Sequence, residues 1–106
     1  MYSYEEIINR SAVEDEIVVG YADAMELLRI LRGKTTRVLG WEGWVKYADG
    51  SLGHSLEHQG TVDLSSMSRE SAIMLSESTI TLANKEWQDN PEISNAELLF
   101  CITTDH

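Results

Sequence analysis

The dipeptide Asp49-Gly50 stands between two runs in which apolar and polar residues alternate, and this arrangement limits the fold more than any other feature of the chain. Alternation with a period of two is typical of strands with one buried face, and Asp-Gly is a strong signal for a two-residue hairpin loop. Such a loop forms a type I′ turn, with positive φ at both central residues. The sequence therefore predicts a central β-hairpin at about residues 36–64, in which residues whose numbers add up to 99 lie opposite each other.

This register gives the predicted hairpin one apolar face and one polar face. The apolar face carries Leu39, Trp41, Val45, Tyr47, Leu52, His54, Leu56, His58 and Val62. The polar face carries Glu42, Trp44, Lys46, Ser55, Glu57, Gln59, Thr61 and Asp63. A sheet that is covered on one side only shows this division.

Helices are predicted on both sides of the hairpin. Ser3 is a good N-cap for a short helix at residues 3–10, and a second helix extends from Asp23 to a C-terminal Gly33. A longer helix begins at Ser68 and continues to about Gln88. Its predicted buried stripe consists of Ala72, Leu75, Thr79, Leu82, Ala83 and Trp87, with Ile73 and Ile80 at the flank.

Two further strands complete the predicted sheet. Residues 17–19 form a short apolar segment, and residues 96–103 form a longer one that is apolar on both faces. A strand that is apolar on both faces usually lies in the interior of a sheet. With 106 residues the chain suffices for one domain. We expect a single α+β domain over residues 1–106, with an antiparallel sheet and two main helices packed on one face.

The charge of the chain is strongly negative. Eighteen Asp and Glu residues against eight Lys and Arg give a formal net charge of −10. A negative field repels nucleic-acid backbones and anionic membranes, and it attracts and steers a basic protein. The N-terminal residues lack the pattern of a secretion signal, and no apolar run is long enough to cross a membrane. We therefore expect a cytoplasmic protein with a basic protein partner.

The polar face of the hairpin is the best candidate for a binding site. In the predicted register Glu42 lies directly opposite Glu57, with Trp44 close to both, and like charges in opposition destabilise a sheet. Trp is enriched at interface centres, and a carboxylate pair is a good receptor for Arg or Lys. We expect partner contacts at Glu42, Trp44, Glu57, Gln59 and Asp63. The alternative is that Lys46 or a neighbour neutralises the two acids and that a helix or loop covers Trp44.

Residues that often form catalytic or metal sites occur here in patterns that do not fit such sites. His54 and His58 are four residues apart on a predicted strand, a separation of about 13 Å, too far to share one metal ion. Cys101, the single cysteine, lies in an apolar run, which favours a buried and inert thiol. The chain contains no nucleophile elbow, no phosphate-binding Gly-rich loop and no His-Glu-x-x-His motif. We therefore expect no catalytic residues, no metal and no cofactor.

The hairpin segment also resembles a known family. Residues 40–54 (GWEGWVKYADGSLGH) and 59–64 (QGTVDL) are similar to immunity proteins of bacterial contact-dependent growth inhibition systems, in the branch that neutralises toxins with a pancreatic-ribonuclease-like fold. The resemblance extends over the whole chain, and its motifs are structural. It implies a cytoplasmic protein that binds the toxin domain delivered by a neighbouring cell and blocks its active-site cleft. It assigns no contact residue, because immunity proteins diversify at their interfaces.

Three function classes follow from these patterns. The first is an immunity-type inhibitor, monomeric when free, that binds a basic ribonuclease toxin in a 1:1 complex. The second is a non-catalytic adaptor or oligomerisation domain that associates through Trp44 and the edge strands. The third is an enzyme with Glu42 or Glu57 as the acid or base, which is disfavoured because a flat sheet face offers little cleft.

Overall fold

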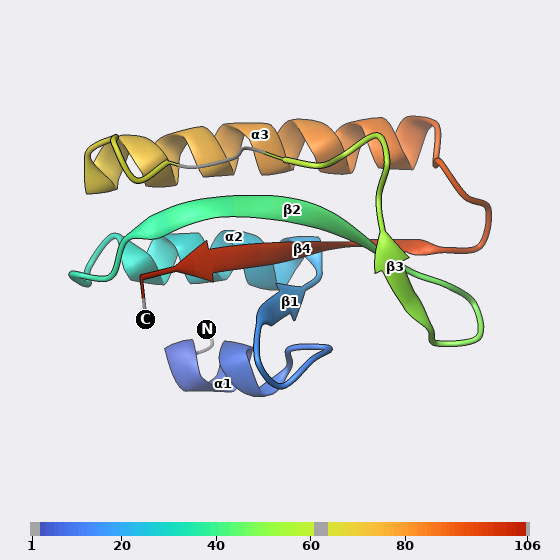
Figure 1. Ribbon diagram of the computed structural model, residues 1–106, viewed down its shortest axis with the longest axis horizontal. Coiled ribbons are helices and arrows are strands. Elements are labelled where there is room, and N and C mark those ends of the chain that lie inside the picture. Colours follow the sequence, from blue (N-terminus) through green and yellow to red (C-terminus); the bar gives the residue numbers. More distant parts are fainter. Residues whose placement is uncertain (1–2, 61–63, 106) are drawn as a thin grey trace.

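The protein is an α+β domain built on a four-stranded antiparallel sheet, as the sequence predicts (Figure 1). The computed structural model describes residues 3–60 and 64–105. The strand order is β1-β4-β2-β3, so the C-terminal strand lies in the sheet interior, as its two apolar faces indicate. In chain order the elements are α1 (Tyr4–Asn9), β1 (Ile17–Val19), α2 (Tyr21–Leu31), β2 (Val38–Lys46), β3 (Leu52–His54), α3 (Arg69–Asp89) and β4 (Glu97–Thr104).

The helices begin largely where the sequence provides caps. Ser3 and Glu6 form a reciprocal capping box at α1, and the Ser68 side chain accepts the backbone N–H of Ser71 at the start of α3. The predicted start of α2 at Asp23 is wrong, because the helix already begins at Tyr21 after Gly20. The Asp23 carboxylate is instead paired with Arg10 at 3.0 Å, so this side chain ties α2 to the end of α1.

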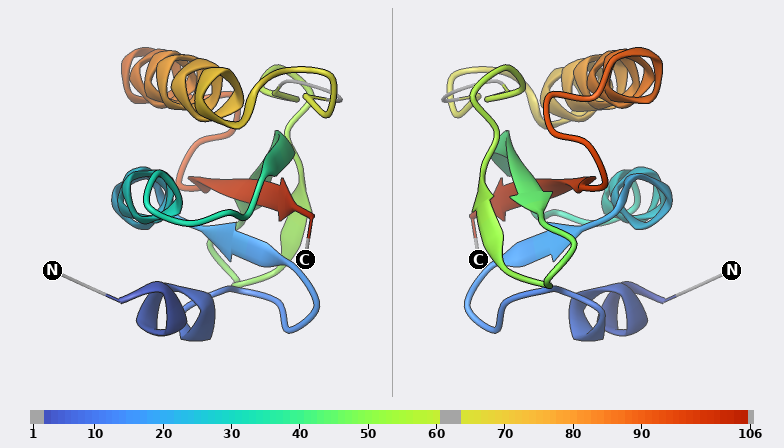
Figure 2. Two further views of the ribbon diagram at one scale, coloured as in Figure 1. Left: turned by 90° about the vertical axis from the view of Figure 1, so that its left-hand side faces the viewer. Right: turned by 90° about the vertical axis from the view of Figure 1, so that its right-hand side faces the viewer.

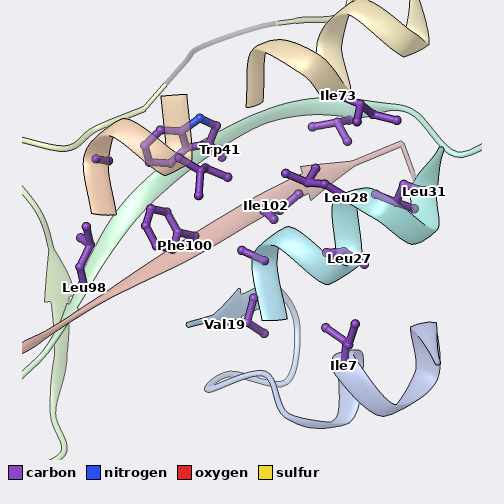
Figure 3. Packing of buried hydrophobic residues seen from close by; sticks show 14 of the residues in the cluster. Ile7, Val19, Leu27, Leu28, Leu31, Trp41, Ile73, Leu98, Phe100 and Ile102 are labelled. Carbon is purple, nitrogen blue, oxygen red and sulfur yellow. The ribbon is translucent and has the colours of Figure 1, made fainter. Parts of the chain in front are cut away.

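The main core lies between the sheet and the two long helices, α2 and α3 (Figure 2). Figure 3 shows Phe100 of β4 near its centre, with its ring against Trp41 at a centroid distance of 5.4 Å. The buried stripe of α3 is rotated about the helix axis relative to the predicted one. Ile73 and Ile80, predicted at the flank, are fully buried at the centre, whereas Leu82 is 56% exposed.

The hairpin turn differs from the predicted one. Of the two residues Asp49 and Gly50, only Gly50 has a positive φ, of 89°, which rules out a type I′ turn. The Gly50 N–H donates to the Tyr47 carbonyl, and the Tyr47 N–H donates to the Ser51 carbonyl. These bonds close a three-residue loop with Gly50 in the left-handed position. Trp44 therefore pairs with His54 and Lys46 with Leu52, one residue away from the predicted register.

Regular pairing of β3 ends at His54, far short of the predicted hairpin end. Gly43 bonds to two residues of the returning chain, accepting from the Ser55 N–H and donating to the His58 carbonyl. Residues 56 and 57 are thereby pushed out of the ladder as a bulge. The chain rejoins β2 where the Leu64 N–H donates to the Leu39 carbonyl at 2.7 Å. The predicted face assignments for residues 61–63 lie outside the described residues.

Candidate functional site

Glu42 and Trp44 lie together on the outer face, the face of the sheet opposite α2 and α3. The Trp44 indole N–H donates to the Glu42 carboxylate at 3.2 Å, and the Trp44 ring packs edge-on against His54 at 4.9 Å. Trp44 is half-buried and Glu42 is exposed. The two main helices cover the other face, so neither helix covers this pair. Among the described residues, Glu42 forms no ion pair.

Cys101 is buried on this outer face, as the sequence predicts. It packs with Val18 and Leu99 in a small apolar cluster that is separate from the main core. Burial, with smaller contributions from Glu16 and Glu42, raises the pKa of the Cys101 thiol to about 12. The thiol is therefore protonated at neutral pH and is a poor nucleophile.

The predicted opposition of Glu42 and Glu57 is wrong. Glu42 lies opposite Cys101 of β4, and Glu57 belongs to the bulge that follows β3. Glu57 and Gln59 line a different surface from Glu42 and Trp44. The physical reason is the shorter pairing of β3, because the chain leaves the ladder before it reaches Glu57. The fifth predicted contact residue, Asp63, lies outside the described residues.

Glu57 and Gln59 line a groove between the bulged segment and α3. We name it the α3 groove and define it by Leu56, Glu57, Gln59 and Gly60 on one wall, Thr79, Leu82 and Glu86 on the other, and Trp41 in the floor. Both views in Figure 2 show this segment running beside α3 above β2. The groove has a volume of about 410 Å³. Its floor is fixed because the Trp41 indole N–H donates to the Thr79 hydroxyl at 2.8 Å.

Sequence reasoning missed three residues of the α3 groove. Leu56 and Leu82 are predicted in the buried set, but they are 77% and 56% exposed. Glu86 is in the last turn of α3, which holds no basic residue although a helix C-terminus favours cations. That misplaced acid is a signal in the sequence that could have indicated the site. The exposure of Leu56 could not have been found, because it depends on the bulge.

A single carboxylate holds the bulged wall of the groove in place. Glu92, in the loop after α3, accepts the Ser55 hydroxyl at 2.8 Å and the backbone N–H groups of Leu56 and Glu57 at 3.1 and 3.2 Å. The buried Ser55 oxygen in turn accepts the His58 N–H at 2.9 Å. Partial burial would raise the pKa of Glu92, but these hydrogen bonds and the charge of His58 lower it below its usual value.

Replacing Glu92 by Gln is expected to cost about 1.5 kcal/mol of unfolding free energy at pH 7, because charge-assisted hydrogen bonds to the bulge are lost. The folded-state pKa of Glu92 is lower than the unfolded one, so its contribution is fully present above the ordinary carboxyl pKa. It is lost as the pH falls through the folded value. Urea unfolding at pH 7 and pH 3 should therefore show a larger difference between wild type and Glu92→Gln at pH 7 than at pH 3. A Glu14→Gln control should match wild type at both values.

Lys85 is adjacent to Glu86 in α3, but the two form no ion pair among the described residues. Five of the eight Lys and Arg residues of the chain lie away from the α3 groove. They gather where α2 ends and α3 begins, at the left of Figure 1, whereas the groove borders the second half of α3. There they contact carboxylates, backbone carbonyls or a ring through Arg29, Arg32, Lys34, Arg37 and Arg69. Within residues 3–60 and 64–105, neither Glu57 nor Glu86 has an ion-pair partner. The groove therefore presents unneutralised negative charge.

His54 and His58 lie in separate aromatic contacts. His54 packs on Trp44, and the half-buried ring of His58 lies 6.1 Å from that of Trp87. No group of His, Cys, Asp and Glu in the described part of the chain is suited to hold a metal ion. No helix formed by these residues has the length and apolarity required to cross a membrane.

Comparison of the chain with protein-family models, with curated proteins and with solved structures finds no match.

Proposed function

We propose that this protein is an immunity-type inhibitor that binds a basic toxin domain in a 1:1 complex and blocks its active site. The observation that carries the proposal is the α3 groove, where Glu57 and Glu86 have no ion-pair partner among the described residues and lie beside the exposed Leu56 and Leu82. Exposed apolar side chains gathered in one groove are typical of a surface that meets another protein, and unneutralised acids beside them favour a partner with complementary positive charge. The net charge of −10 favours a basic protein as the partner.

The class of toxin follows from the same charge. A ribonuclease has to bind a phosphate backbone, so its cleft is basic. An acidic inhibitor can occupy the position of that backbone and exclude the RNA. The resemblance of residues 40–54 and 59–64 to immunity proteins of the pancreatic-ribonuclease-like branch supports this class. We propose Glu42, Trp44, Glu57, Gln59 and Asp63 as contact residues, with carboxylates receiving Arg or Lys and Trp44 as an apolar anchor.

The test uses the toxin domain that this proposal expects the neighbouring open reading frame to encode. Wild-type protein should inhibit its ribonuclease activity and bind it with an association rate that falls as salt rises. The double variant Glu42→Lys/Glu57→Lys should associate about tenfold more slowly at low salt, because steering charge is lost and repulsion is added. The measurement is biolayer interferometry at several salt concentrations, with circular dichroism to verify the fold.

The matched control changes the net charge by the same amount elsewhere. Glu5→Lys/Glu70→Lys alters exposed acids in the first turns of α1 and α3, away from both candidate surfaces. It should slow association much less than the double variant. Undiminished binding by Glu42→Lys/Glu57→Lys would remove these two residues from the interface, and a wild-type protein that leaves the ribonuclease active would refute the inhibitor function.

A further inference from the structure

The α3 groove has apolar residues on both of its walls. Leu56 is 77% exposed on the bulged wall, and Leu82 is 56% exposed on the α3 wall. Each side chain leaves apolar area in water although the chain has a well-filled core. The two line one groove rather than being scattered singly over the surface. Their arrangement favours an occupant with an apolar portion that packs between them.

The polar groups of the groove limit the occupant further. The Thr79 hydroxyl accepts the Trp41 N–H and donates to the Leu75 carbonyl, both at 2.8 Å, so the floor is already satisfied. Among the described lining residues, the carboxylates are those of Glu57 and Glu86, one on each wall. His58 adds a half-buried ring to the lining of the groove. The groove thus combines anionic acceptors with apolar and aromatic side chains.

A guanidinium group fits this combination better than an ammonium group. It presents five donors in a plane, so it can bond to carboxylates on two sides while its face rests on apolar or aromatic atoms. Its alkyl stem packs on apolar surface while the charged head stays near water. An ammonium group is more strongly hydrated and has no flat face.

We propose that the α3 groove is a receptor for an arginine side chain of a basic protein segment, with its stem against Leu56 and Leu82 and its guanidinium between Glu57 and Glu86. This assignment rests on the proposed function, since the segment belongs to the toxin domain. It places the main anchor of the complex in the groove rather than on the outer face. Glu92 then acts as a positioning residue, because it fixes the bulge that carries Leu56 and Glu57.

The first test titrates the ¹⁵N-labelled protein with the peptide acetyl-Gly-Leu-Arg-Leu-Gly-amide and follows amide shifts by NMR. The expected shifts are confined to residues 56–60 and to α3 from Thr79 to Glu86. Replacing the arginine by neutral citrulline should raise the Kd about fivefold, because two surface ion pairs are lost. Equal affinity for the two peptides, or shifts that lie away from the groove, overturn the proposal.

Matched variants test whether peptide binding depends on the residues of the groove or only on the overall charge and apolarity of the protein. Glu57→Gln/Glu86→Gln should raise the peptide Kd about fivefold, whereas Glu70→Gln on the same helix should leave it unchanged. Leu82→Ser should weaken binding, whereas Met74→Ser, which changes another exposed apolar residue of α3, should not. Equal effects in either pair overturn the assignment.

The toxin domain distinguishes the two proposals. If it binds wild type and Glu57→Gln/Glu86→Gln with equal affinity, the groove is not its receptor and the inhibitor function stands. If the toxin domain does not bind while the arginine peptide still selects the groove, the inhibitor function fails and the arginine receptor stands.

Discussion

Replacing Gly43 by Ala is expected to lower the unfolding free energy by about 3 kcal/mol, because the new methyl group collides with backbone. A Cβ at this position would lie 2.1 Å from the carbonyl oxygen of His58 and 3.2 Å from its carbonyl carbon. Neither atom belongs to a flexible side chain. Relief requires that the bulge move, which breaks the hydrogen bonds of Gly43 with Ser55 and His58. Urea unfolding at pH 7 measures the loss.

Gly33→Ala is the matched control for this substitution. A Cβ at Gly33 would meet its nearest atom, the Ile30 carbonyl oxygen, at 3.7 Å, which is an ordinary contact. Its φ also lies outside the left-handed region. The control should therefore change stability by well under 1 kcal/mol. A Gly43→Ala protein as stable as this control would mean that the His58 backbone does not lie against β2 at residue 43.

The elements that local patterns determine were predictable from the sequence. Ser68 caps α3 because its side chain reaches a backbone N–H three residues on, and this requires no knowledge of the rest of the fold. The interior place of β4 follows from its two apolar faces. Gly43 of β2 leaves room for the close approach of the His58 backbone, because a Cβ there would lie 2.1 Å from the His58 carbonyl oxygen.

The register of the hairpin could not be predicted because Asp49-Gly50 suits two different loops. In both loops Gly occupies a left-handed position, and only the φ of Asp49 tells them apart. The observed loop also contains two hydrogen bonds from Ser51 to the Asp49 carboxylate, at 2.9 and 2.6 Å. A change of one residue in register transfers every following side chain to the other face. The predicted faces of the second strand failed for this reason.

The candidate site depends on a contact that is distant in sequence. Glu92 holds the bulge from 35 to 37 residues away, and nothing near residues 55–58 indicates that their backbone will bond to a carboxylate. Without knowledge of that contact, the sequence does not determine on which surface of the domain the side chains of Leu56 and Glu57 lie. The pair Glu42 and Trp44 was predictable, because residues two apart on one strand share a face whatever the register.

Replacing Phe100 by Ala is expected to lower the unfolding free energy by about 4 kcal/mol, a large part of the roughly 5–15 kcal/mol available to a domain of this size. Phe100 is fully buried, and its ring packs edge-on against Trp41 at 5.4 Å and Tyr21 at 6.4 Å. Truncation therefore leaves a cavity between the sheet and its helices. Thermal and urea unfolding, with the wild type in parallel, measure the change.

Leu99→Ala, one residue earlier on β4, provides the comparison on the outer face. Leu99 packs in the small cluster with Val18 and Cys101, with Trp44 partly covering it. Fewer neighbours surround a cavity there, and the site can relax toward solvent, so the expected loss is about 2 kcal/mol. Equal losses from the two substitutions would mean that the outer face is packed as tightly as the helix-covered face.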